Sequence, residues 1–196
     1  MVNYSKWDNI GDSSDEEAPA KAAPPAKAVP AGEEPIGEGF CSGALDASLT
    51  AEHVLRAMRV RAAKPQLFEP AVPGQGYEVE EMLRYTRQVV TFGAGSELAD
   101  MRPKVTHVYD DAKREELRCV DVDASGAETD GEVVHALLRD PLRIAHFERS
   151  VSTGKRRVSA MPTCVVEAMI AKTAEIAARF RDGTDESGVA PAFPAL

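Results

Sequence analysis

A proline- and alanine-rich stretch near the N-terminus divides this chain and limits how much of it can fold. Residues 18–39 contain five prolines and, before Ile36, no large side chain that a core could bury. Proline removes a backbone donor and biases a chain towards the extended polyproline II conformation. We therefore expect an acidic docking peptide over residues 1–17, a disordered linker over 18–44, an α+β domain over 45–183 and a disordered tail over 184–196.

The negative charge of the chain is concentrated before the expected domain. Residues 1–40 carry three Lys against eight Asp or Glu, a net charge of −5 out of −9 for the whole chain. This balance opposes non-specific binding to nucleic acid or anionic lipid. The sequence has no apolar stretch long enough to span a bilayer, and its acidic start is unlike a secretory signal. We therefore expect a cytoplasmic protein without a nucleic-acid or membrane partner.

The first part of the domain has the apolar spacing of helices. Residues 49–63 fit one helix, and Tyr77 to Phe92 fit a second one, whose end over QVVTF could be extended. After Pro103 the pattern changes to alternation, which predicts one strand around Val105–Tyr109 and another around Leu117–Val122. Because only 6% of the residues are aromatic, the core must be mainly aliphatic.

The second part of the domain adds two helices and two strands. Gly131–Arg139 fits a short helix, and Leu142–Phe147 and Arg157–Met161 fit a strand pair. A last helix begins at Pro162 and ends near Gly183. The expected fold class is α+β: two N-terminal helices, then a four-stranded antiparallel sheet built as strand-strand-helix twice, with helices packed on one face. Whether the two units are a duplication stays open, because their sequences match poorly.

The N-terminal peptide combines apolar side chains with acid. Tyr4, Trp7 and Ile10 stand three residues apart, and Trp7 is the one tryptophan of the chain. In a helix this spacing places the three side chains on one side. We expect Tyr4, Trp7, Asp8 and Ile10 to bind a protein partner.

The same peptide carries serines that an acidophilic kinase recognises. Ser13 has Glu16 three residues later, and Ser14 has Glu17. A kinase of the casein kinase 2 type reads such an acid, and phosphate would add charge and three strong acceptors for an Arg/Lys cluster on a partner. The alternative is an acidic tail that is never modified.

A further phosphorylation candidate is Ser159, which follows Arg156 and Arg157 in the pattern that a basophilic kinase prefers. The alternative is an exposed basic hairpin whose Ser159 lies in a strand. Both interpretations stay open at this point.

The first seventeen residues, MVNYSKWDNIGDSSDEE, resemble the start of the cell-division-cycle-37 family, the kinase-targeting co-chaperones of the ninety-kilodalton heat-shock chaperone. The resemblance implies a role in assemblies of a chaperone with its kinase clients, with Ser13 as a regulatory phosphorylation site. The Arg-rich region and long helical hairpin of that family do not follow here. The matching residues are Met1, Val2, Tyr4, Ser5, Trp7, Asp8 and Ile10.

Signals for catalysis and for cofactors are weak. The four histidines are scattered, the three cysteines form no CxxC pair, and Asp121 and Asp123 favour a solvated strand end over a metal or acid/base pair. Gly93-Ala94-Gly95 is similar to the first turn of a dinucleotide-binding unit, but Leu98 occupies the place of the third glycine. We therefore expect no metal and no cofactor.

These observations favour a non-catalytic adaptor or co-chaperone-like binding protein. Its partner would be the ninety-kilodalton chaperone or a kinase client, and its modifying enzyme a casein kinase 2 type kinase. The alternative is a small enzyme or ligand-binding α+β domain for which the leader is only a tether, and a third possibility is a structural subunit. The sequence leaves the question of enzymatic activity open, with the balance against it.

Overall fold

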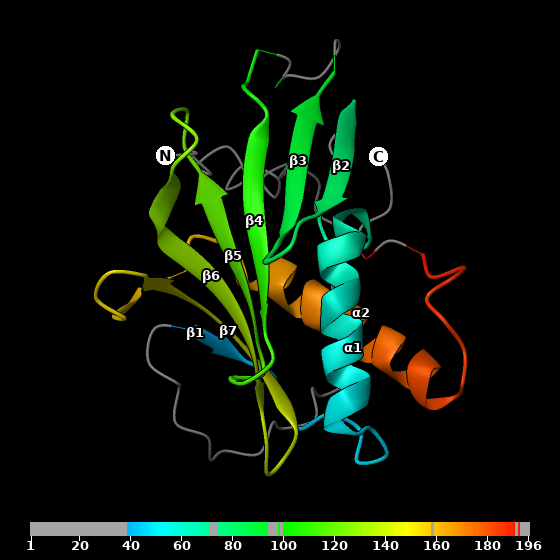
Figure 1. Cartoon of the computed structure of the whole chain (residues 1–196). Helices are drawn as coiled ribbons and strands as arrows, with labels where there is room; N and C mark the ends of the chain where they lie inside the picture. The colour runs from blue at the N-terminus through cyan, green and yellow to red at the C-terminus, as the bar shows by residue number, and fades with distance from the viewer. Residues whose placement is uncertain are drawn as a thin grey trace, which may run out of the picture. The chain divides into compact units, whose positions relative to one another are not determined.

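The structure is a computed structural model, and it describes residues 39–70, 74–93, 98, 100–157, 159–190 and 192. In this part of the chain one antiparallel sheet packs against two α-helices (Figure 1). The strand order is β1-β7-β6-β5-β4-β3-β2, and the short strand β8 pairs with β7 next to β1. In chain order the elements are β1 (Gly39–Cys41), α1 (Ala51–Ala63), the 3-10 turn η2 (Pro65–Leu67), β2 (Gln75–Glu81), β3 (Thr86–Phe92), β4 (Lys104–Asp111), β5 (Glu116–Val122), β6 (Glu128–Leu138), β7 (Arg143–Ser150), β8 (Arg156–Arg157) and α2 (Thr163–Arg181).

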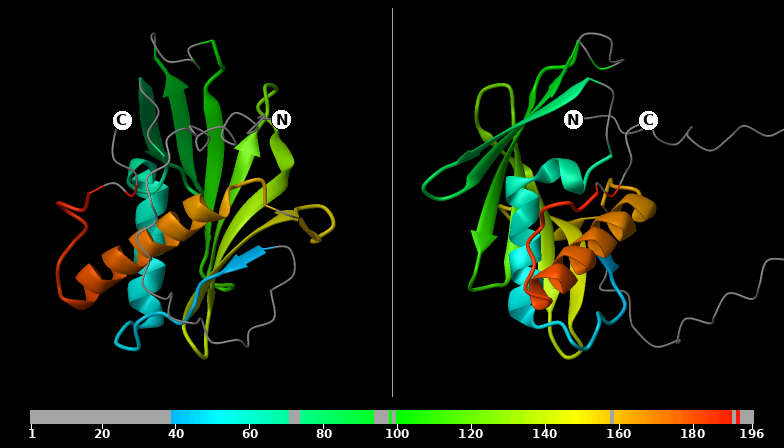
Figure 2. Two further views of the ribbon diagram at one scale, coloured as in Figure 1. Left: turned by 180° about the vertical axis from the view of Figure 1, so that it is seen from behind. Right: turned by 90° about the vertical axis from the view of Figure 1, so that its right-hand side faces the viewer.

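Both helices pack on the same face of the sheet, here called the inner face, and cross one another there (Figure 2). The core between them combines Val54 of α1 and Ile176 of α2 with Leu117 and Ile144 of the sheet, and none of these side chains is more than 3% exposed. Burial of such aliphatic surface contributes about 25 cal/mol per Å² and is the main source of stability. Polar side chains that enter this layer therefore need partners inside it.

Two of the four helices predicted from the sequence are present, α1 and α2. At the start of α1, Thr50 Oγ1 accepts a hydrogen bond from the His53 amide, and His53 Nδ1 accepts one from the Thr50 amide, which is the reciprocal arrangement of a capping box. Helix α2 follows Pro162, whose fixed φ suits a helix start, and it ends before Gly183, which has a φ of 74°. Neither of these two described helices combines the length and apolarity needed to cross a bilayer.

The segment predicted as a second helix, Tyr77–Phe92, is a β-hairpin instead. Strands β2 and β3 pair along their whole length, as the β-branched residues of β3 favour. The helical pattern depended on Met82 and Leu83, but these residues lie in the turn, and Leu83 is 99% exposed. Turns usually carry glycine or short polar residues. The apolar side chains in this turn therefore produced a helical spacing in the sequence, although they are exposed in the structure.

The short helix predicted over Gly131–Arg139 is also wrong, because most of these residues belong to strand β6. His135 and Leu137 are buried on the inner face, whereas Val134 and Ala136 are buried on the opposite face, here called the outer face. A strand that is buried on both faces reads as a continuous apolar run without alternation. Such a run cannot be told from a buried helix by its period.

The expected fold of two N-terminal helices and a four-stranded sheet is therefore overturned. The described chain forms an eight-stranded antiparallel sheet with one early helix and one C-terminal helix. The expected repeat disappears with the helix over 131–139, since β4, β5, β6 and β7 are consecutive neighbours in one sheet. The sheet also begins earlier than the expected domain start at residue 45, because Gly39 already pairs with Phe147.

Candidate functional site

Three polar side chains meet in the core between the helices and the sheet. Arg61 comes from the last turn of α1, His135 from β6 and His146 from β7, and they are 8%, 5% and 0% exposed. The two histidines are cross-strand partners, and their ring centroids lie 4.7 Å apart. Burying polar groups is costly unless they are hydrogen-bonded. This set, here called the interior cluster, is therefore the strongest candidate site among the described residues.

The hydrogen bonds of the interior cluster run in one direction. The Arg61 guanidinium can only donate, so the His135 Nε2 atom that it contacts must accept. His135 then carries its proton on Nδ1 and donates to His146 Nδ1 at 3.4 Å. His146 is therefore protonated on Nε2, which donates to Ser159 Oγ at 3.3 Å. The Ser159 hydroxyl donates to Glu148 Oε1 at 3.1 Å. This series of hydrogen bonds therefore begins at the Arg61 guanidinium and ends at the Glu148 carboxylate.

Both imidazoles are neutral in this arrangement. Burial, and after it the positive charge of Arg61, holds the pKa of His135 well below 6.5 and lowers the pKa of His146 from 6.5 to about 4. Protonation of His135 would also remove the acceptor that Arg61 uses. The interior cluster thus carries one fixed positive charge, on Arg61.

A small cavity lies beside the interior cluster. Its volume is about 10 Å³, which is the space that one water molecule needs. Larger molecules would have to displace core side chains. No group of three or more metal-ligating side chains occurs among the residues that the structure describes. The cavity is lined by Arg61, His135 and Thr173 and by the apolar side chains of Met58, Leu117, Ile144, Met169 and Ile170.

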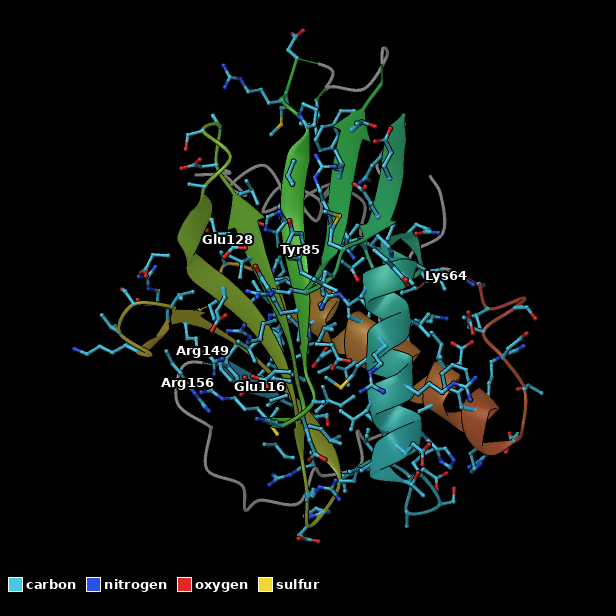
Figure 3. The ribbon with its side chains drawn as sticks, in the orientation of Figure 1. Lys64, Tyr85, Glu116, Glu128, Arg149 and Arg156 are labelled. Atoms are coloured by element: carbon cyan, nitrogen blue, oxygen red, sulfur yellow. The ribbon has the colours of Figure 1, made fainter. Side chains whose placement is uncertain are left out.

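The outer face of the sheet carries a network of ion pairs. Glu132 is 2% exposed and accepts hydrogen bonds from Arg118 Nη1 at 3.2 Å and from Arg149 Nε. Arg149 also donates to Glu116 Oε2 at 2.8 Å through Nη2. Figure 3 shows Arg149 and Glu116 close together over the lower part of the sheet. Because these residues come from β5, β6 and β7, the network ties three strands together.

A second part of the outer face combines aromatic and apolar side chains. Tyr85, at the end of the β2–β3 turn, stacks on His107 with ring centroids 4.1 Å apart, and His107 Nδ1 lies 2.7 Å from Glu128 Oε1 (Figure 3). The Met82 amide closes the turn by donating to the Tyr85 carbonyl at 2.9 Å. Residues 82–85, here called the hairpin tip, expose Leu83 to 99% and Met82 to 43%. Among the described residues the tip exposes the largest fraction of an apolar side chain, at Leu83, and Val79, Met101 and Val151 are also exposed elsewhere on the surface.

Of the residues predicted from the sequence, one is described. Ser159 is half-buried, and its hydroxyl belongs to the hydrogen-bond chain between His146 and Glu148. A phosphate there would remove the donor to Glu148 and place like charges side by side, and modification of Ser159 stays a prediction. The other predicted residues, Tyr4, Trp7, Asp8, Ile10, Ser13 and Ser14, lie outside the described residues.

Sequence reasoning missed the interior cluster. Arg61 and His135 are 74 positions apart, and His135 and His146 are 11 apart, so no local motif joins them. The one available signal was that each histidine interrupts an apolar run. To infer from this signal that the two histidines pair, one needs the register of β6 and β7. The mistaken prediction of a helix over 131–139 excluded that register.

No known protein-family model matches this chain, and no curated protein matches it either. The class of protein is therefore defined by its architecture: an antiparallel sheet that packs two helices on one face, with a directed polar cluster in the core between them.

Proposed function

We propose that the protein is a non-catalytic adaptor of the cytoplasm, similar to a co-chaperone, which binds a protein partner through its N-terminal peptide. Tyr4, Trp7 and Ile10 would enter an apolar groove of the partner, and Asp8 would remain at its polar rim. The partner that we propose is the ninety-kilodalton heat-shock chaperone. Support for this choice is the resemblance of residues 1–17 to the start of the kinase-targeting co-chaperones.

The hairpin tip is the observation in the folded domain that carries the proposal. Leu83 and Met82 expose apolar surface next to the stacked ring of Tyr85. Grouped apolar side chains on a surface are typical of sites that contact another protein. The exposed tip therefore favours a function in which the surface of the domain binds another protein.

Phosphorylation would adjust this binding. A phosphate on Ser13 or Ser14 adds about −1.5 to −2 charges and three acceptor oxygens to a segment that is already acidic. A cluster of Arg and Lys on the partner would then bind more tightly. We assign the modification to a kinase of the casein kinase 2 type, because both serines have a glutamate three residues later.

The test uses the full chain and the purified ninety-kilodalton chaperone, with binding measured by calorimetry. We expect the wild-type chain to bind, Trp7→Ala to weaken the affinity at least about tenfold, and phosphorylation at Ser13 to strengthen it. Asn9→Ala is the matched control and should leave the affinity unchanged. Absence of wild-type binding, or equal binding by Trp7→Ala, would refute docking of this peptide on the chaperone.

A second pair of variants tests the hairpin tip in the same assay. Leu83→Ser removes the exposed apolar side chain, whereas Arg84→Ser changes its neighbour in the same turn. We expect the first substitution to weaken binding severalfold and the second to have little effect, with unchanged melting temperatures for both. Equal affinities of the two variants would show that the tip is not part of the contact.

A further inference from the structure

We propose that Arg61 and the cavity beside it form a binding site for one monovalent anion of about the size of chloride. The site lies in the core of the domain, and the proposal goes beyond the adaptor function and does not depend on it. Three features of this place are relevant: the charge of Arg61, the neutrality of its neighbours, and the size and lining of the cavity.

Arg61 brings a positive charge into the core. Its side chain is 8% exposed, and no carboxylate among the described residues forms an ion pair with it within 4.0 Å. Arg59, two positions earlier on α1, shows the contrast, because its guanidinium is about half exposed and pairs with Asp110 at 2.6 Å. An ion that is removed from water without a counter-ion is strongly destabilised. An anion next to Arg61 would offset this loss.

The hydrogen-bond partner of Arg61 does not supply the missing charge. His135 accepts through a neutral imidazole, and two imidazoles and a hydroxyl separate Arg61 from Glu148 at the other end of the chain. A guanidinium has five N–H groups, and the contact with His135 involves the Nη1 nitrogen. Donors therefore remain for a ligand that accepts hydrogen bonds.

The cavity decides which anion fits. Arg61 lines it, together with His135, Thr173 and apolar side chains, and its volume of about 10 Å³ suits a single atom of the size of a water molecule. Phosphate, sulfate and carboxylates need several times this space. The Thr173 hydroxyl already donates to the Met169 carbonyl at 2.9 Å. A halide that accepts hydrogen bonds from the Arg61 N–H groups fits the volume of the cavity and compensates the positive charge of Arg61. The methyl and methylene groups of the lining would surround the rest of the ion.

The first test compares the melting temperature of the full chain in sodium chloride and in sodium gluconate at equal ionic strength. Gluconate is too large for the cavity, so it serves as the non-binding anion. If chloride is present at about ten times its dissociation constant, we expect a melting temperature about 4 °C higher than in gluconate. Equal melting temperatures in the two salts would overturn the proposal.

Variants of α1 show whether the effect belongs to this site. Arg61→Gln removes the charge and should abolish the difference between chloride and gluconate. Arg59→Gln removes a surface guanidinium from the same helix and should retain it. A chloride effect that persists in Arg61→Gln, or is lost in Arg59→Gln, would place the anion elsewhere and overturn the assignment.

A direct measurement on the wild-type chain decides the matter even if Arg61→Gln does not fold. Crystals grown or soaked in sodium bromide would show anomalous scattering from each bound bromide. We expect a peak within hydrogen-bond distance of the Arg61 guanidinium. A cavity that holds water, with no anomalous peak in it, would refute the anion site.

Discussion

His135 and His146 make the stability of the domain depend on pH. In the unfolded chain each histidine titrates near 6.5, whereas in the folded chain burial and the charge of Arg61 lower the pKa of His146 to about 4 and hold the pKa of His135 well below its usual value. Between these pKa values the unfolded state binds more protons than the folded state. The two histidines therefore leave the free energy of unfolding unchanged well above pH 6.5 and lower it as the pH decreases towards 4. For His146 alone we expect a loss of the order of 3 kcal/mol in the free energy of unfolding, measured by urea denaturation across this range.

A variant separates this effect from the titration of carboxylates. His146→Gln can still accept through Oε1 and donate through Nε2, but it cannot be protonated. We expect its stability to fall less between pH 6.5 and 4 than that of the wild-type chain. The pKa of Asp130 is lowered to about 2 by its hydrogen bonds to Ser150 and Ser152, so its contribution is lost only below about pH 4. An unchanged slope above pH 4 in His146→Gln would contradict the assignment.

Single residues also show where sequence reasoning reaches its limit. Thr50 is recognisable as a cap because its partner, His53, is three positions away. The contact between Arg61 and His135 depends on the packing of α1 against β6. Nothing within either local sequence determines that packing. The sequence contains each residue of the candidate site, but it does not predict that these residues come into contact.

At the scale of elements, helix α2 and most of strand β7 were predicted correctly, whereas strand β6 and the hairpin tip were not. Helix α2 buries Met169, Ile176 and Phe180 at helical spacing, which is a one-sided pattern. Strand β6 is buried on both faces, and the hairpin tip is buried on neither, since Leu83 is almost fully exposed. Periodicity reports the difference between two faces, so it carries no signal in the last two cases.

Glu132 should matter for the cohesion of the sheet, because its carboxylate joins Arg118 of β5 to Arg149 of β7 and is 2% exposed. Removing one partner from a buried pair leaves the remaining charges uncompensated. We expect Glu132→Gln to lower the free energy of unfolding by about 3 kcal/mol, measured by chemical denaturation.

Glu80 provides the comparison, since it forms a looser pair with Arg87 at 3.9 Å and is 64% exposed. Exposed ion pairs contribute little because water and salt screen them, so Glu80→Gln should change the stability much less than Glu132→Gln. Similar effects of the two substitutions would mean that the network over β5, β6 and β7 has no special role.

At the scale of the whole molecule, the edge of β7 is completed by two short strands from distant parts of the sequence. Strand β1 pairs with residues 145–147, and β8 continues with residues 148 and 149. At Gly39, a Cβ atom would come within 2.9 Å of the His146 carbonyl and of Phe147 Cβ, so only glycine allows this approach. The sheet edge therefore depends on residues that resemble linker in composition.

Two fragments test where the folded unit begins. Residues 35–196 form a compact unit that includes β1, and we expect this fragment to melt within about 2 °C of the full chain. Residues 45–196 lack β1, the buried part of Phe40, and Ser42, whose hydroxyl accepts a hydrogen bond from the Ile144 amide at 3.0 Å. Their loss should lower the melting temperature by about 10 °C, and the exposed edge of β7 should promote aggregation. Equal melting of the two fragments, measured by calorimetry, would show that β1 is dispensable and that the domain begins at residue 45.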